Sequence, residues 1–161
     1  MIRAITEIGV AVRDLGEATQ LLTRRLGAVA GPLQRFEPYA MEFRMCRVGN
    51  VDFELMAPLD DEGVIARFLR RHGEGLHHIG FAVDDLAAAQ QAMTAEGLEF
   101  VEPVPKRQRF LVHDFDGQAI EADVGFNFSR PASLLGLLLE FIQYPPGFAL
   151  AASAGRKEGQ A

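Results

Sequence analysis

The sequence predicts an α+β fold made of two copies of one structural unit, and three observations support this prediction. The stretch "EIGVAVRDL" begins at Glu7 and returns as "HIGFAVDDL" at His78, with its apolar residues in register. In both copies an aspartate follows the strand and can cap a helix, and a glycine ends that helix. Strand-like runs follow each helix. A repeat that keeps both the strand and the helix start indicates an internal duplication with a pseudo-twofold axis.

The first copy begins with a strand over Ile5–Val12. Asp14 caps the next helix, because its carboxylate accepts the free backbone N–H groups of the first turn. Apolar residues at helical spacing mark this helix, and Gly27 provides the left-handed residue that ends it. Three strand-like runs follow, at about Ala28–Phe36, Tyr39–Val48 and Val51–Met56.

The second copy repeats this order from a strand over Leu76–Val83. Asp84 or Asp85 caps its helix, and Gly97 ends it. The strands expected after the helix lie at about Leu98–Val101, Arg107–His113 and Leu135–Gln143.

The domain organisation follows from the two copies. We expect a first module over residues 1–59, a connecting helix over 60–75 and a second module over 76–146, with an insertion at about 114–134 and a flexible tail over 147–161. One module alone leaves a sheet face uncovered, so two modules are expected to bury these faces together, with a cavity between curved sheets.

Composition excludes several classes of function. A net charge of −6 and a pI of about 5.2 argue against nucleic-acid or anionic-membrane partners. Cys46 is the only cysteine, which excludes a disulfide framework and a thiolate metal cage. No apolar run reaches membrane-spanning length, and the N-terminus lacks a basic segment followed by an apolar one. These features predict a cytoplasmic protein.

Four polar residues interrupt otherwise apolar strands. Glu7 and His78 lead equivalent strands of the two copies, whereas Glu54 and Glu140 lie in the closing strand of each half. Buried carboxylates need a partner or a cation, because desolvating their charge is costly. Singly, each could be a solvent-facing or hydrogen-bonded residue. As a symmetric set of imidazole and carboxylates, they predict a divalent metal site for Mn, Co, Ni, Fe, Zn or Mg.

Three stretches carry a resemblance to a known family: "GLHHIGFAVDDL", "ELMAPL" with the helix after it, and "LLLEFIQYP". They resemble the vicinal oxygen chelate superfamily (glyoxalase, bleomycin resistance and dioxygenase proteins), and especially methylmalonyl-CoA epimerases. The resemblance runs from about Ile5 to Pro145. It implies two βαβββ modules forming a cupped mixed β-sheet around a metal and substrate cavity. It also implies a homodimer.

The resemblance assigns the metal ligands to Glu7, Glu54, His78 and Glu140. The family usually has His in the first of these positions, and this sequence departs from it with Glu7. Glu7 is therefore either a fourth ligand or a base beside a three-residue metal site. The identity of the last metal ligand is also open, because "DFDGQAIEADV" resembles a closing strand of the superfamily as well. Glu121 thus competes with Glu140, and the match of "LEFIQYP" to the epimerases favours Glu140.

In epimerases of this type, a carboxylate removes the proton alpha to a thioester, the metal stabilises the enolate, and a second carboxylate returns a proton to the other face. The resemblance makes Glu42, Glu140 and Glu7 the candidates for these catalytic roles. The basic cluster "KRQR" at 106–109 could meet the phosphates of an acyl-CoA, although a solvated strand end is the more frequent reason for such a cluster. The Phe-rich segment at 114–134 could form a flap or a wall over the cavity, and a plain core or dimer contact would explain its phenylalanines equally well.

Three functions remain open from the sequence. The first is a metal-dependent isomerase or epimerase that abstracts a proton alpha to a carbonyl, with an acyl-CoA thioester or another small carbonyl compound as substrate. The second is a glyoxalase-like lyase on the same site. The third is a metal-free module that binds small molecules, like resistance proteins of the superfamily. The missing first-strand His disfavours an extradiol dioxygenase, whose iron needs two His and one carboxylate.

Overall fold

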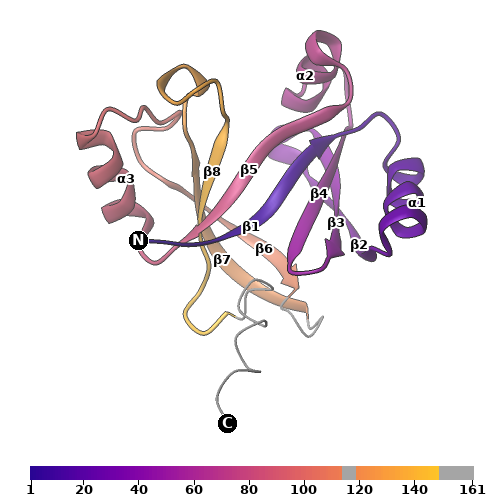
Figure 1. The fold of residues 1–161 in the computed structure, drawn as a ribbon, viewed down its shortest axis with the longest axis horizontal. Coiled ribbons are helices and arrows are strands. Elements are labelled where there is room, and N and C mark those ends of the chain that lie inside the picture. Colours follow the sequence, from indigo (N-terminus) through magenta and orange to yellow (C-terminus); the bar gives the residue numbers. More distant parts are fainter. Residues whose placement is uncertain (114–118, 149–161) are drawn as a thin grey trace. The chain divides into compact units, whose positions relative to one another are not determined.

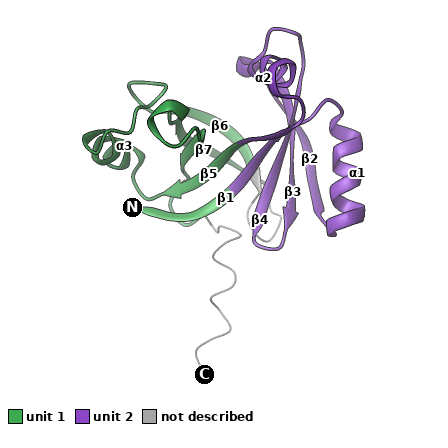
Figure 2. Ribbon diagram, turned by 45° about the horizontal axis from the view of Figure 1, so that its top comes forward, with its two compact units in different colours: residues 1–6, 78–161 green, residues 7–77 purple. Residues whose placement is uncertain are grey.

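The computed structural model describes residues 1–113 and 119–148, and the chain divides into two compact units (Figure 2). The first unit in chain order is Glu7–His77, drawn in purple and labelled unit 2 in Figure 2. The second combines Met1–Thr6 with the residues from His78 onward and is labelled unit 1 in that figure. The chain therefore passes from one unit to the other at two peptide bonds, after Thr6 and after His77.

The first unit contains a four-stranded sheet with the strand order β1-β4-β3-β2 (Figure 1). Strands β1 and β4 are parallel, and the other neighbours are antiparallel. The elements are β1 (Ile2–Ala11, from Glu7 in this unit), α1 (Leu15–Leu26), β2 (Val29–Phe36), the 3-10 turn η1 (Glu37–Tyr39), β3 (Met41–Val48), β4 (Val51–Pro58) and α2 (Val64–His72).

The second unit repeats this topology with the strand order β5-β8-β7-β6. Strands β5 and β8 are parallel, whereas β8, β7 and β6 are antiparallel neighbours. Its elements are β5 (Gly75–Val83, from His78 in this unit), α3 (Leu86–Ala95), β6 (Lys106–His113), β7 (Ala119–Phe128), the 3-10 turn η2 (Pro131–Ser133) and β8 (Leu139–Gln143). The predicted α+β fold with two βαβββ modules and mixed strand pairing is thus confirmed.

The first half of β1 completes the second unit at the edge of β5. The Thr6 hydroxyl donates to the carbonyl oxygen of Gly80 at 3.4 Å, and the Arg3 guanidinium lies 3.2 Å from the Asp84 carboxylate. One strand therefore contributes its N-terminal residues to one unit and its C-terminal residues to the other.

Two expectations for the second copy need correction. Leu98–Val101 is not a strand of the sheet, since only Phe100 forms an isolated bridge, to Ser129. The segment predicted as an insertion at 114–134 instead contains β7, which pairs with both β6 and β8. Strand β7 takes the place that β3 has in the first module, so β7 itself is a regular part of the repeat. Residues 114–118, and 149–161 of the predicted tail, lie outside the described part.

Helices α1 and α3 each begin at an aspartate that the repeat indicates. The Asp14 carboxylate accepts a hydrogen bond from the Glu17 backbone N–H at 2.8 Å, and the Asp85 carboxylate accepts one from Ala88 at 2.9 Å. Of the two aspartates expected to start α3, Asp85 is therefore the cap. Gly27 ends α1 with φ of 66°, in the left-handed region that favours glycine.

Helices α1 and α3 also each cover one face of their own sheet. In the first unit, Val12, Leu15 and Leu55 belong to one core cluster between α1 and the strands. In the second unit, Leu86, Leu139 and Phe141 form the equivalent cluster beneath α3. Because side chains alternate along a strand, the residues between these core positions face away from the helix. Among the described residues, no helix is long and apolar enough to cross a membrane.

Removing either cap should destabilise the protein. Asp14→Ala and Asp85→Ala should each lower the free energy of unfolding by about 1 kcal/mol, because a backbone N–H of the first turn loses its acceptor. Urea denaturation measures this change. Asp14→Asn is the matched control, since the amide oxygen can still accept the bond. An equal loss in Asp14→Asn and Asp14→Ala would show that the negative charge, and not the cap, matters.

Candidate metal centre

A histidine and a glutamate meet on one face of the second unit. The Nε2 atom of His78 lies 3.1 Å from Oε2 of Glu140, and the two side chains are 2% and 12% exposed. His78 comes from β5 and Glu140 from the parallel neighbour β8. Their positions are diagonal, because the direct partner of Glu140 across the strands is Gly80. A glycine at that partner position adds no side chain between the imidazole and the carboxylate.

The orientation of this pair follows from the alternation of side chains. Ile79, Leu139 and Phe141 pack in the core cluster beneath α3. His78 and Glu140 are their immediate neighbours along the chain, so they face the opposite side of the sheet. The helix that buries one face thereby directs both polar side chains to the other.

Phe128 supports the imidazole from the side. Its ring meets the His78 ring edge-on, with the ring centroids 5.5 Å apart and the planes at 88°. Phe128 is also the direct partner of Glu140 in the antiparallel pairing of β7 and β8. One aromatic side chain therefore stands next to both members of the pair. The prediction from sequence missed this role, because it assigned no strand to the segment that carries Phe128.

The first unit places two carboxylates in the equivalent positions. Glu7 is 5% exposed and Glu54 is 7% exposed, so both are buried. Their relation is the same diagonal one, because the direct partner of Glu54 in the parallel pairing of β1 and β4 is Gly9. Leu55 and Val12 pack beneath α1, so Glu54 and Glu7 face away from this helix. The duplicated framework thus presents a glutamate pair in one unit and a histidine–glutamate pair in the other.

Glu121 does not share the face that carries the histidine–glutamate pair. Along β7, Ala122, Val124 and Phe126 alternate with Glu121, and Phe126 is the direct partner of Ile142 on the Glu140 face of β8. Glu121 therefore faces the other side, where its carboxylate lies 3.2 Å from Nε of Arg109. Both side chains of this ion pair are exposed. This geometry favours Glu140 over Glu121.

Glu42, which the resemblance makes a candidate base, lies on the α1 face of its sheet. Glu42 lies on β3, four residues before Cys46, so the two side chains are on the same face of the strand. Cys46 packs in the core beneath α1. Glu42 therefore faces the α1 side of the sheet, opposite to Glu54. Its carboxylate pairs with the Arg35 guanidinium at 3.7 Å. The sequence could not show this, because the phase of β3 depends on where α1 packs.

The basic cluster at 106–109 is largely engaged with carboxylates. Lys106 Nζ pairs with Glu102 at 2.6 Å, and Arg109 pairs with Glu121. These ion pairs reduce the charge that the cluster could offer to phosphates. The geometry supports the interpretation of "KRQR" as a solvated strand end.

Cys46 belongs to the core and not to the candidate metal centre. Its side chain is 0% exposed, and burial raises the pKa of its thiol, an effect that the nearby Arg44 partly offsets. The raised pKa keeps the neutral thiol form at neutral pH, whereas a metal ligand must be a thiolate.

The comparisons with known proteins agree with this architecture. A family model described as the Glyoxalase/Bleomycin resistance protein/Dioxygenase superfamily matches residues 6–114. The chain belongs to this superfamily. The crystal structure of methylmalonyl-CoA epimerase from Mycobacterium tuberculosis superposes with a TM-score of 0.77 at 25% identity, over 90% of each chain.

Two relatives from other organisms have similar names. The chain is 31% identical over 98 residues to the ethylmalonyl-CoA/methylmalonyl-CoA epimerase of Cereibacter sphaeroides, covering 60% of this chain and 73% of that enzyme. It is 29% identical over 104 residues to the mitochondrial methylmalonyl-CoA epimerase of Dictyostelium discoideum, covering 63% of this chain and 62% of that enzyme. For the mouse mitochondrial enzyme, the match spans 48% of the relative's length. These relatives are enzymes, and the predicted resemblance to epimerases is confirmed.

Cys46 should resist thiol reagents in the folded protein. The reaction with an aromatic disulfide reagent at pH 8 should be much slower in buffer than in concentrated urea, because the folded state hides the sulfur and disfavours the thiolate. Absorbance of the released chromophore measures both rates. A native rate equal to the rate in urea would show that Cys46 is accessible.

Proposed function

We propose that the protein is a metal-dependent, epimerase-like isomerase that transfers a proton at the carbon alpha to the carbonyl of an acyl-CoA thioester. The observation that carries this proposal is the equivalent placement of the two polar pairs, Glu7 with Glu54 and His78 with Glu140, on the faces that point away from α1 and α3 in a duplicated framework. The named relatives supply the reaction class and the acyl-CoA substrate class.

The metal ligands in this proposal are Glu7, Glu54, His78 and Glu140. The chain passes between the two units directly before Glu7 and directly before His78. The leading residue of each copy is therefore the first residue after a boundary between the units, so Glu7 and His78 are equivalent in chain position as well as in the repeat. The cavity implied by the family resemblance is part of the same proposal.

The donor set suits a divalent first-row ion. His78, Glu7 and Glu54 are buried, and an ionised carboxylate loses most of its hydration when it is buried. One imidazole nitrogen and several carboxylate oxygens are ligands that Mn, Co, Ni, Fe and Zn accept, and carboxylate-rich sets also suit Mg. Neither unit offers a thiolate at these positions, since Cys46 lies on the α1 face.

The residues divide into holding and proton-transferring roles. When bound, the ion would supply Lewis acidity toward the thioester carbonyl oxygen. The Phe128 ring keeps the His78 imidazole facing Glu140. Glu140 and Glu7 are the carboxylates left for removing and returning the proton, because Glu42 faces the α1 side. Each carboxylate has two oxygens, so one oxygen can hold the ion while the other accepts a proton.

A metal titration with a matched control tests the ligand set. Protein purified without chelators and reloaded with Mn²⁺, Co²⁺ or Ni²⁺ should bind one ion per chain. Glu140→Gln should weaken metal binding by more than about tenfold. Loss of a residue that only supports a ligand already costs about tenfold or more in metal affinity, and loss of a ligand itself should cost more. Glu121→Gln makes the same chemical change on the opposite face of the sheet and should leave the affinity unchanged. Absence of metal binding in the unmodified protein would refute the proposed function.

Deuterium exchange tests the reaction class. The metal-loaded protein should catalyse exchange of the alpha proton of methylmalonyl-CoA in deuterium oxide, and Glu140→Gln should lose this activity. Mass spectrometry of the thioester measures the exchange. Metal binding without exchange into any of a panel of acyl-CoA thioesters would favour a glyoxalase-like lyase. Tight binding of a small molecule with neither metal nor exchange would favour a resistance-type module.

Glu7→His tests the departure from the usual family ligand. The substitution should keep the fold and change the metal affinity, because a neutral imidazole replaces a carboxylate and shifts the preference toward softer ions. Parallel titrations with Mn²⁺ and Ni²⁺ should show a gain for Ni²⁺ relative to Mn²⁺. Unchanged affinity for both ions would remove Glu7 from the ligand set and leave it the role of a base.

The cytoplasmic location and the homodimer also remain predictions.

A further inference from the structure

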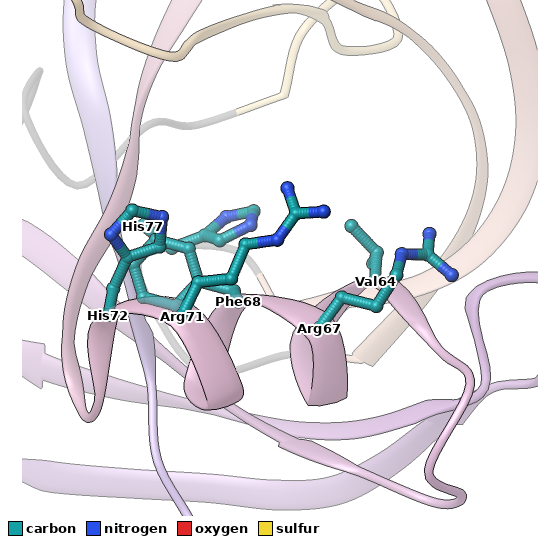
Figure 3. Close-up of a pocket in the computed structure, with 6 residues that line it drawn as sticks. All are labelled: Val64, Arg67, Phe68, Arg71, His72 and His77. Atoms are coloured by element: carbon teal, nitrogen blue, oxygen red, sulfur yellow. The ribbon is translucent and has the colours of Figure 1, made fainter.

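An open hollow on α2 takes no part in the proposed metal centre (Figure 3). Its volume is about 190 Å³. All of its lining residues belong to the first unit, and five of them come from α2: Val64, Arg67, Phe68, Arg71 and His72, with His77 from the start of β5.

The lining residues of α2 form a single face of the helix. Their spacing is that of successive neighbours on one helical stripe, three or four residues apart. Ile65, Ala66 and Leu69 are buried on the other side of the helix, and α2 contacts β4. The hollow therefore lies on the outer face, which in an amphipathic helix is ordinarily polar throughout. Here that face also carries Val64 and Phe68.

Three rings gather at one end of the hollow. The Phe68 ring lies 4.8 Å from the His72 ring and 4.9 Å from the His77 ring, centroid to centroid. Figure 3 shows these rings grouped together, with the Arg71 side chain beside them and the Arg67 side chain next to Val64, farther along the helix. The Phe68 side chain is only partly buried, so a planar group could stack on the cluster.

The hollow is positively charged in a chain whose net charge is −6. Arg67 donates through Nη1 to the backbone carbonyl of Glu62, which is a neutral acceptor. Among the described residues, no carboxylate forms an ion pair with Arg67 or Arg71. Basic residues in the last turn of a helix also interact favourably with the negative end of the helix dipole. That effect accounts for Arg71 and His72, but Arg67 lies one turn earlier.

We propose that this hollow binds a phosphate-bearing adenine nucleotide group. Guanidinium groups match the geometry of phosphate oxygens and can bind them in a bidentate manner. The cluster of Phe68 with two imidazoles offers an aromatic surface on which a purine can stack. In an acyl-CoA, this group is the phosphorylated adenosine at the end of a long flexible arm, so it need not adjoin the reacting carbon. The assignment to acyl-CoA rests on the proposed function, whereas the nucleotide site does not.

Calorimetric titration of the full chain with adenosine 3′,5′-bisphosphate tests the site. The double variant Arg67→Gln/Arg71→Gln should weaken binding at least tenfold. Arg24→Gln/Arg25→Gln is the matched control, since it removes the same charge from exposed positions at the end of α1 and should bind as the unmodified protein does. Circular dichroism verifies that both variants are folded. No binding at millimolar nucleotide, or equal weakening in both variants, would overturn the proposal.

Kinetics with acyl-CoA identify the source of the nucleotide and separate the two proposals. If the group belongs to the substrate, the double variant should raise KM for methylmalonyl-CoA at least tenfold with little change in kcat, because the contact is made equally in the ground and transition states. Weaker binding of the bisphosphate with an unchanged KM would assign the site to a free nucleotide. Nucleotide binding in a protein that shows no proton exchange would leave this site standing while the proposed function fails.

Discussion

The placement of the candidate metal centre depends on one constraint, the alternation of side chains along a strand. Helices α1 and α3 each bury one face of a sheet, and the apolar residues of the strands must turn toward them. The residues between those apolar positions therefore point to the opposite face of the sheet. All four polar residues of the candidate metal centre occupy such positions: Glu7, Glu54, His78 and Glu140. Burial there removes water from each side chain, and this loss must be compensated by a proton, a hydrogen-bond partner or a cation. The helices thus position the polar residues without contacting them.

Much of this arrangement could be predicted from the sequence because it repeats. The apolar frame, the helix caps and the leading polar residues recur in register, so the topology of one module predicts that of the other. The prediction failed where local pattern and tertiary pairing disagree. Leu98–Val101 has the residue pattern of a strand but forms only one isolated bridge. The segment with β7 is predicted as an insertion, because the sequence of β7 does not show that it pairs with β6 and β8.

The phase of a strand is a second limit of the sequence. Glu42 and Glu54 both lie in strands of mixed polarity, and nothing in their neighbours shows which face each occupies. Only the packing of Cys46 beneath α1, together with the pairing of β3 with β4, places the two carboxylates on opposite faces. The sequence also did not predict the α2 hollow, because basic residues near the end of a helix are common and do not by themselves indicate a site.

The division of β1 between the two units has a consequence for the order in which the chain folds. The residues of Met1–Thr6 precede their neighbour β5, which begins at Gly75, so they cannot pair with that strand until it has been synthesised. Closing this long loop costs entropy before the contact returns any stability. The first unit is continuous in sequence and can form its own sheet in the meantime, whereas the second cannot be completed from its C-terminal residues alone. Separating the gene between His77 and His78 would therefore not separate the two units.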